Sequence, residues 1–142
     1  MSAASRKYLE MSIRTAPPEE LILRVYDVLV MAGKAALQQM YDNRADVQAV
    51  YDHVRRAQSA LVVLMGGLDL EAGGELAKNL LAIYEFWHWQ LSLAGTRRDP
   101  SYVERVLPHF IEYRKTWAEV VRRYRAEQVA GKKSEEVNQQ YA

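Results

Sequence analysis

The residues of this chain that could support catalysis or bind a metal are its three histidines and a glutamate near one of them. Glu85 precedes His88 by three residues, the spacing with which di-iron carboxylate bundles hold metal from one helix. Those sites need a second such pair and a further glutamate from each of two other helices, whereas this sequence has one pair. His53 and His109 stand alone and are interpreted as surface or hydrogen-bonded groups. The sequence therefore predicts no metal site.

Motifs for covalent catalysis and for phosphate binding are also missing from the sequence. The chain has no cysteine and no Gly-x-Ser-x-Gly turn that would present a nucleophilic serine. Its paired glycines around residues 66–74 lack the Gly-Lys-Ser/Thr ending of a phosphate loop. We therefore expect a protein that is not an enzyme and has no cofactor. A catalytic site of an unrecognised kind is the open alternative.

Charge and hydropathy argue against nucleic acid and membrane as partners. The 142 residues include 19 Lys and Arg against 18 Asp and Glu, so there is no basic excess. Arg122, Arg123 and Arg125 cluster near the end of a predicted helix, and interspersed Glu119 and Glu127 favour a role at the helix dipole over a nucleic-acid site. No stretch approaches the roughly 20 apolar residues of a membrane span. We expect one cytoplasmic domain without nucleic-acid binding or membrane insertion.

Four segments repeat their apolar residues with a helical period, and no segment alternates as a strand. The expected helices cover residues 18–41, 46–65, 74–94 and 99–128. Because short loops join helices of similar length, neighbouring helices should run antiparallel. The predicted fold class is all-α, an up-down four-helix bundle.

Prolines, glycines and an aspartate mark the ends of these helices. Pro18 suits a first helical turn, Asp99 with Pro100 suits the start of the last helix, and Gly95 suits the end of the third. Pro108 should kink the last helix or fray its first turn. The chain is divided into a flexible N-terminal segment (1–14), the bundle (15–128) and a polar tail (129–142), which is predicted to be disordered because it lacks an apolar stripe.

The third predicted helix carries more apolar surface than one core contact needs. Leu76, Leu80, Ile83, Trp87 and Leu91 form the expected core stripe. A second stripe lies about 120° away and consists of Ala82, Phe86, Trp89 and Leu93. Either this helix packs against two neighbours, or the second stripe forms a groove that accepts an amphipathic helix of a partner. Three further apolar residues lie off the core stripes of their helices: Val62, Val63 and Ile111.

A set of short motifs follows in order along the chain. On and before the first helix it includes Thr15, Pro18, Leu21, Tyr26 and Asp27. Later members are Arg56, Ala57, Gln58, Gly74, Glu75, Asn79, Leu80, Tyr84 and Trp117. In this order and spacing the motifs resemble the flagellar secretion chaperone family FliS, across about residues 8–117.

The resemblance implies an antiparallel bundle that binds newly made flagellin in the cytosol. In that family the disordered C-terminal segment of flagellin wraps around the bundle, which prevents premature polymerisation, and the complex is delivered to the flagellar type III export gate. By the same resemblance, Tyr8 and Ile13 would plug the groove when no client is bound. Pro17 stands where the family usually has serine, so the side-chain cap of the first helix is lost. A structural or adaptor bundle that oligomerises, or binds another export component, through the second stripe is the alternative, and the oligomeric state is open.

Overall fold

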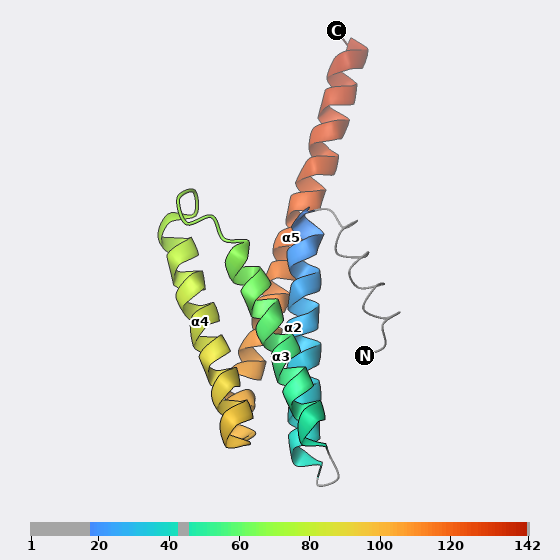
Figure 1. Cartoon of the computed structure of the whole chain (residues 1–142). Coiled ribbons are helices and arrows are strands. Elements are labelled where there is room, and N and C mark those ends of the chain that lie inside the picture. Colours follow the sequence, from blue (N-terminus) through green and yellow to red (C-terminus); the bar gives the residue numbers. More distant parts are fainter. Residues whose placement is uncertain (1–17, 43–45, 142) are drawn as a thin grey trace.

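The described part of the chain forms an all-α, up-down bundle in our computed structural model, which describes residues 18–42 and 46–141 (Figure 1). Its helices are α2 (Pro18–Tyr41), α3 (Val47–Gly66), α4 (Gly74–Arg97) and α5 (Ser101–Tyr141). Consecutive helices run in opposite directions, and α2 packs on α3 and α5 while α4 packs on the same two helices. The predicted four-helix bundle is confirmed. The predicted segment 1–14, with Tyr8 and Ile13, and Thr15 lie outside the described residues.

Local capping explains where the helices begin. The Asp46 carboxylate accepts a hydrogen bond from the Gln48 backbone N–H at 3.0 Å, which satisfies one free donor at the start of α3. Asp99 does the same for the Ser101 N–H at 2.9 Å, and this bond lowers the pKa of the Asp99 carboxyl. Gly74 begins α4 with a positive φ of 53°, a backbone conformation that other residues rarely adopt. Capping aspartates therefore set the first turns of α3 and α5.

The end of α4 differs from the prediction. Gly95 was expected to end the helix, but α4 continues to Arg97 and the left-handed residue is Arg98, with φ 50° and ψ 41°. Gly95 is buried, and a Cβ atom there would lie 3.5 Å from the ring of Tyr51 on α3. Gly95 therefore lies inside the contact of α4 with α3, where a methyl group would make only an ordinary contact, and it does not terminate the helix.

The end of α5 also differs from the prediction. The tail 129–142 was expected to be disordered, whereas α5 runs without a break to Tyr141 (Figure 1). Lys, Glu and Gln, which dominate this stretch, are good helix formers even without a packing partner. Every described residue beyond Val121 is exposed, so the missing apolar stripe leaves the helix unpacked without ending it. Pro108 lies inside α5 and does not end the helix either.

The core lies between the four helices and consists mainly of aliphatic side chains with one aromatic cluster. Its most buried members are Leu29, Leu61, Leu91, Val103, Val106 and Phe110. Trp87 and Leu91 take the core positions predicted for α4, and Leu80 and Ile83 pack partly buried against them. Leu76 was predicted to be in the core but is 70% exposed, because α4 turns Ala77 inward at its start.

Two tyrosines join opposite helices through the centre of the core. The hydroxyl oxygens of Tyr26 on α2 and Tyr84 on α4 lie 2.5 Å apart, and both side chains are buried. Burial raises the pKa of both phenols, so both remain neutral hydrogen-bonding groups. The Tyr84 ring lies 5.7 Å from that of Trp87, which in turn makes an edge-on contact with Phe110 at 5.1 Å. This pair connects α2 and α4, whose backbones do not otherwise approach each other within the described residues.

Candidate functional site

The second apolar stripe of α4 lies on the outside of the bundle. Phe86 is 57% exposed and Trp89 is 60% exposed, although Trp87 between them is buried in the core. Ala82 is also exposed, and Leu93 is half-buried. The stripe was expected either to pack against a second neighbouring helix or to form a groove for a partner. Because its aromatic members are exposed, they do not pack against a second helix. We call the four residues the α4 ridge.

One side of the α4 ridge borders a hollow between α4 and α5. Ala82 and Phe86 line it from the ridge, and His109 and Tyr113 line it from α5. The buried Trp87 and the partly buried Ile83 also line it, and its volume is about 360 Å³. The lining is mostly apolar, and its polar groups are the imidazole of His109 and the hydroxyl of Tyr113.

The other side borders a hollow between α3 and α4. Trp89 lines it together with Glu85, His88 and Met65 of α3, and its volume is about 320 Å³. Val62, 56% exposed, shares the face of α3 that carries Met65, since the two are three residues apart. The ridge therefore separates two open apolar grooves, one against each neighbouring helix.

A polar contact closes the α3–α4 groove at one end. The Gln58 side-chain amide donates to the hydroxyl of Ser92 at 2.7 Å and to the backbone carbonyl of His88 at 3.2 Å. Ser92 also donates to the same carbonyl at 3.2 Å. Gln58 thus holds α3 and α4 together beside the groove.

Two of the predicted partner-binding residues lie apart from these grooves. Val63 is 55% exposed on α3 and Ile111 is 41% exposed on α5, and neither lines a hollow described here. The Glu85–His88 pair has no third potential ligand beside it, since the described residues hold no cluster of three or more metal-binding side chains. None of the helices in residues 18–42 and 46–141 is both long and apolar enough to span a membrane.

Most of the motif residues make contacts within the bundle. Asp27 on α2 forms an ion pair with Arg114 on α5, next to the buried Tyr26. Ala57 is fully buried on α3, one residue before Gln58. Glu75 pairs with Lys78 on the surface at 3.6 Å. Tyr26, Asp27, Gln58 and Tyr84 therefore position the helices that carry the α4 ridge.

The other motif residues have varied surroundings. Pro18 is the first residue of α2, and Leu21 and Arg56 are half-buried. Asn79 is exposed and Leu80 packs against the core. Trp117 is partly buried, and its indole N–H has no hydrogen-bond partner among the described residues. Trp117 is thus a motif residue with a buried polar group that no described residue satisfies.

Sequence reasoning missed several polar contacts between helices. Glu20 at the start of α2 pairs with Arg125 of α5, and Arg114 pairs with Asp27. Arg122 and Arg123 pair with Glu119 on α5 and lower the pKa of its carboxyl to about 2. The arginine cluster was assigned to the helix end, but α5 continues beyond it, so its members make side-chain ion pairs instead.

The surroundings of the partly buried His53 also depart from the prediction. His53 was expected to be a surface or hydrogen-bonded group, but its Nδ1 atom is buried without a partner among the described residues. Burial lowers the pKa of the imidazole, with Arg56 as a further cause. No sequence signal distinguishes such a histidine from an exposed one.

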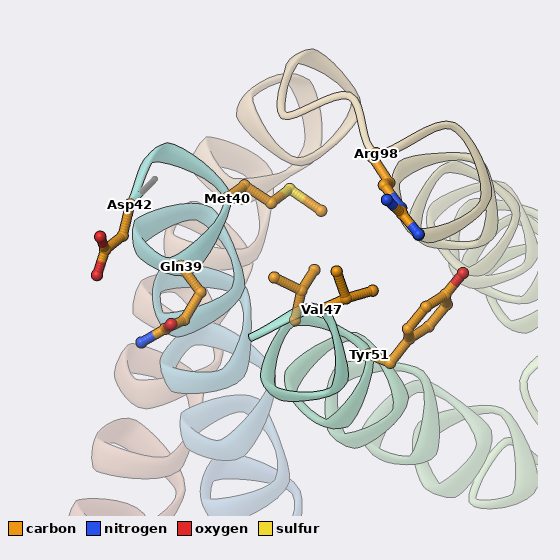
Figure 2. A pocket seen from close by; sticks show the side chains of 8 residues that line it. Gln39, Met40, Asp42, Val47, Tyr51 and Arg98 are labelled. Atoms are coloured by element: carbon orange, nitrogen blue, oxygen red, sulfur yellow. The ribbon is translucent and has the colours of Figure 1, made fainter. Parts of the chain in front are cut away.

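A third cavity lies at the end of the bundle where α2, α3 and α4 meet (Figure 2). Met40, Val47 and Val50 supply apolar walls, Tyr51 and Arg98 lie on another side, and the volume is about 140 Å³. No stretch of the sequence predicts this cavity, since its lining comes from three helices. We refer to it as the end cavity.

Comparison with known proteins agrees with the motifs and the bundle. A sequence model of the family described as "Flagellar protein FliS" matches residues 1–124 of this chain. The flagellar secretion chaperone FliS of Salmonella typhimurium is 26% identical over 121 residues, which cover 84% of this chain and 88% of that protein. Its namesake in Vibrio cholerae is 27% identical over 95 residues, 67% of this chain and 66% of the relative. FliSB of Pseudomonas aeruginosa is 28% identical over 116 residues, 80% of this chain and 92% of the relative. Because the family model covers nearly the whole chain, the protein belongs to the FliS family.

Proposed function

We propose that this FliS-family protein is a cytoplasmic export chaperone that binds the C-terminal segment of flagellin along the α4 ridge. Its relatives are named flagellar secretion chaperones, which supports a role in flagellar export. The observation that carries the placement is the exposure of Phe86 and Trp89 between two apolar grooves. In this proposal the bound client cannot polymerise prematurely and is handed to the flagellar export gate, and the chaperone is not an enzyme.

The geometry suits a client that folds as it binds. A disordered segment loses about 2–5 kcal/mol or more when it becomes ordered, so it needs a long apolar contact surface. Two grooves on either side of one ridge offer two parallel tracks for amphipathic helices, one over Phe86 and one over Trp89. Aromatic anchors at the centre of such contacts commonly supply most of the binding energy.

Calorimetric titration with a synthetic C-terminal flagellin segment tests the proposal. Wild-type protein should bind at micromolar concentration. Phe86→Ala and Trp89→Ala should each weaken binding by about 30-fold, corresponding to a hot-spot loss of about 2 kcal/mol. Both side chains are largely exposed, so neither change should lower the stability of the free protein by more than about 0.5 kcal/mol.

Met31→Ala provides a matched control, because Met31 is 69% exposed on α2, away from the α4 ridge. It should bind the segment as the wild type does. Absence of heat from the wild type would reject flagellin as the client. Normal binding by both ridge variants would reject the ridge as the site but not the client.

Val62, Val63 and Ile111 belong to the same proposal as secondary contacts beside the ridge. Val62 shares the face of α3 that carries Met65 of the α3–α4 groove, so it should have the largest effect of the three when changed to alanine. Val63 and Ile111 would contribute only if the client extends beyond the grooves onto the neighbouring faces of α3 and α5. Comparison of the three alanine variants in the same titration measures how far the client reaches.

The N-terminal residues Tyr8 and Ile13 are proposed to cover part of the groove when no client is bound. Deletion of residues 2–13 should then increase client affinity, because no internal competitor remains. An unchanged affinity would reject the plug and leave the chaperone assignment intact.

A second candidate function is a structural or adaptor bundle, which the exposed aromatic residues of the α4 ridge also suit. Such a protein would self-associate through the ridge or bind another export component there. Light scattering with and without flagellin separates the two functions. A dimer that Trp89→Ala dissociates, and that flagellin does not, would favour the adaptor.

A further inference from the structure

The end cavity differs from the two grooves in size and in enclosure. Its volume of about 140 Å³ is below the roughly 300–1,000 Å³ of pockets that hold cofactors or drug-sized ligands. Met40 and Val47 point into it, while the side chains of Gln39 and Asp42 point away from it (Figure 2). The cavity is therefore suited to a single apolar side chain.

A cation lies at the mouth of this cavity. The guanidinium of Arg98 points across the opening toward the hydroxyl of Tyr51 (Figure 2). Arg98 makes no hydrogen bond or ion pair with any residue in the described ranges. The neighbouring Arg97, by contrast, donates to the Tyr102 hydroxyl at 2.8 Å and lies 5.8 Å from the centre of that ring. Of the two arginines at the end of α4, Arg98 is thus the one whose guanidinium has no partner among residues 18–42 and 46–141.

Arg98 also has an unusual backbone conformation. The residue that follows a helix in the left-handed conformation is usually glycine, because any side chain is strained there. Here an arginine occupies that position, with φ 50°. Arg98 lines the cavity in spite of this backbone conformation, and a glycine at this position would lose the cation.

We propose that the end cavity docks a segment of another polypeptide in which an aliphatic or aromatic side chain lies next to a carboxylate. The apolar side chain enters between Met40 and Val47, and the carboxylate accepts hydrogen bonds from Arg98. Guanidinium matches the planar carboxylate with two parallel donors, and the Tyr51 hydroxyl can supply a third. The Gln58–Ser92 contact lies between this site and the α3–α4 groove. The inference therefore concerns a different surface from the proposed function and does not depend on it.

The test is an NMR titration of the ¹⁵N-labelled full chain with three short capped peptides at millimolar concentration. The first contains Phe-Asp between serines, the second Phe-Asn and the third Ala-Asp. The first should shift the amide resonances of Tyr51, Gly95 and Arg98. The second should bind about two- to fivefold more weakly, the loss expected for an exposed ion pair. The third should not shift these resonances.

Two variants make the test specific. Arg98→Gln should bind the Phe-Asp and Phe-Asn peptides equally. Gly95→Ala should abolish binding of both, since its methyl group would stand 3.5 Å from the Tyr51 ring, an ordinary contact that the fold tolerates but that narrows the cavity. Unchanged discrimination by Arg98→Gln would overturn the proposal, as would peptide shifts confined to the α4 ridge.

The occupant could instead be this chain's own N-terminal segment. In that case deletion of residues 2–13, without any peptide, would shift the resonances of Tyr51, Gly95 and Arg98, and the proposal of a second polypeptide would be rejected. Flagellin affinity of the full chain, measured by calorimetry, is a separate readout, so failure here and failure of the chaperone assignment are distinguishable.

Discussion

The buried hydroxyl pair of Tyr26 and Tyr84 gives the sharpest prediction about stability. Removal of one hydroxyl leaves the other buried at the centre of the core without its partner. An unsatisfied buried polar group costs about 1–3 kcal/mol, which exceeds the net value of about 1 kcal/mol for the bond itself. We therefore expect Tyr26→Phe and Tyr84→Phe each to lower the free energy of unfolding by about 1–3 kcal/mol.

The double variant should behave differently from the sum of its parts. With both hydroxyls absent, two phenyl rings meet in an apolar core and no polar group is stranded. The double change should cost about 1 kcal/mol or less, so the two substitutions are coupled by at least 1 kcal/mol in a double-mutant cycle. Urea unfolding followed by tryptophan fluorescence provides the assay, since Trp87 lies 5.7 Å from the Tyr84 ring.

Tyr124→Phe is the matched control, because its hydroxyl is exposed and accepts a bond from Gln128 at 2.7 Å. It should change the free energy of unfolding by less than about 0.5 kcal/mol. If the double variant instead loses the sum of the two single losses, the hydroxyls do not act as a pair and the reasoning fails.

Glycine packing, backbone strain and histidine burial supply further tests of stability. Gly33→Ala would place a methyl carbon 3.1 Å from a side-chain carbon of Leu107, so it should lower the free energy of unfolding in urea by about 1–3 kcal/mol. A methyl group at Gly131 meets open space, so Gly131→Ala should raise the helix content measured by circular dichroism. Arg98→Gly should stabilise by about 1 kcal/mol in the same urea assay, because it relieves a left-handed residue, and unchanged stability would show that no strain is stored there. Burial lowers the pKa of His53, so the unfolded chain binds the proton more tightly and the wild type should lose stability as the pH falls through about 6.5. His53→Gln should flatten that dependence, and an unchanged slope between pH 8 and pH 5.5 would show that His53 does not cause it.

Much of the fold was predictable because its signals are local. Pro18, Asp46 and Asp99 lie within a residue or two of where helices begin, since the groups that a cap satisfies are its own neighbours. The spacing of Phe86 and Trp89 predicted a stripe separate from the core, and both are exposed. Periodicity predicts these features because it depends only on the helix that carries them.

Features that depend on a second helix were beyond such reasoning. Gly95 resembles a helix stop in the sequence, yet it lies inside α4 against Tyr51 of α3, and the sequence of α4 alone does not reveal that contact. The apolar character of Leu76 cannot reveal that Ala77, and not Leu76, faces inward at the start of α4. The end cavity and the Tyr26–Tyr84 bond likewise join residues that lie far apart in the chain, so no single stretch encodes them.

The length of α5 affects how unfolding experiments on this protein should be interpreted. The helix continues for about 20 residues past Val121, the last buried residue, which at about 1.5 Å per residue gives an arm of roughly 30 Å. Most of the stability of a helix in a protein comes from packing, which this arm lacks, so the arm should melt gradually and independently of the bundle. Far-UV circular dichroism would then report the melting of the arm and the unfolding of the bundle, whereas tryptophan fluorescence would report the unfolding of the bundle alone. A two-state free energy is defined for the bundle alone, and a chain truncated after Gln128 should make the two signals coincide.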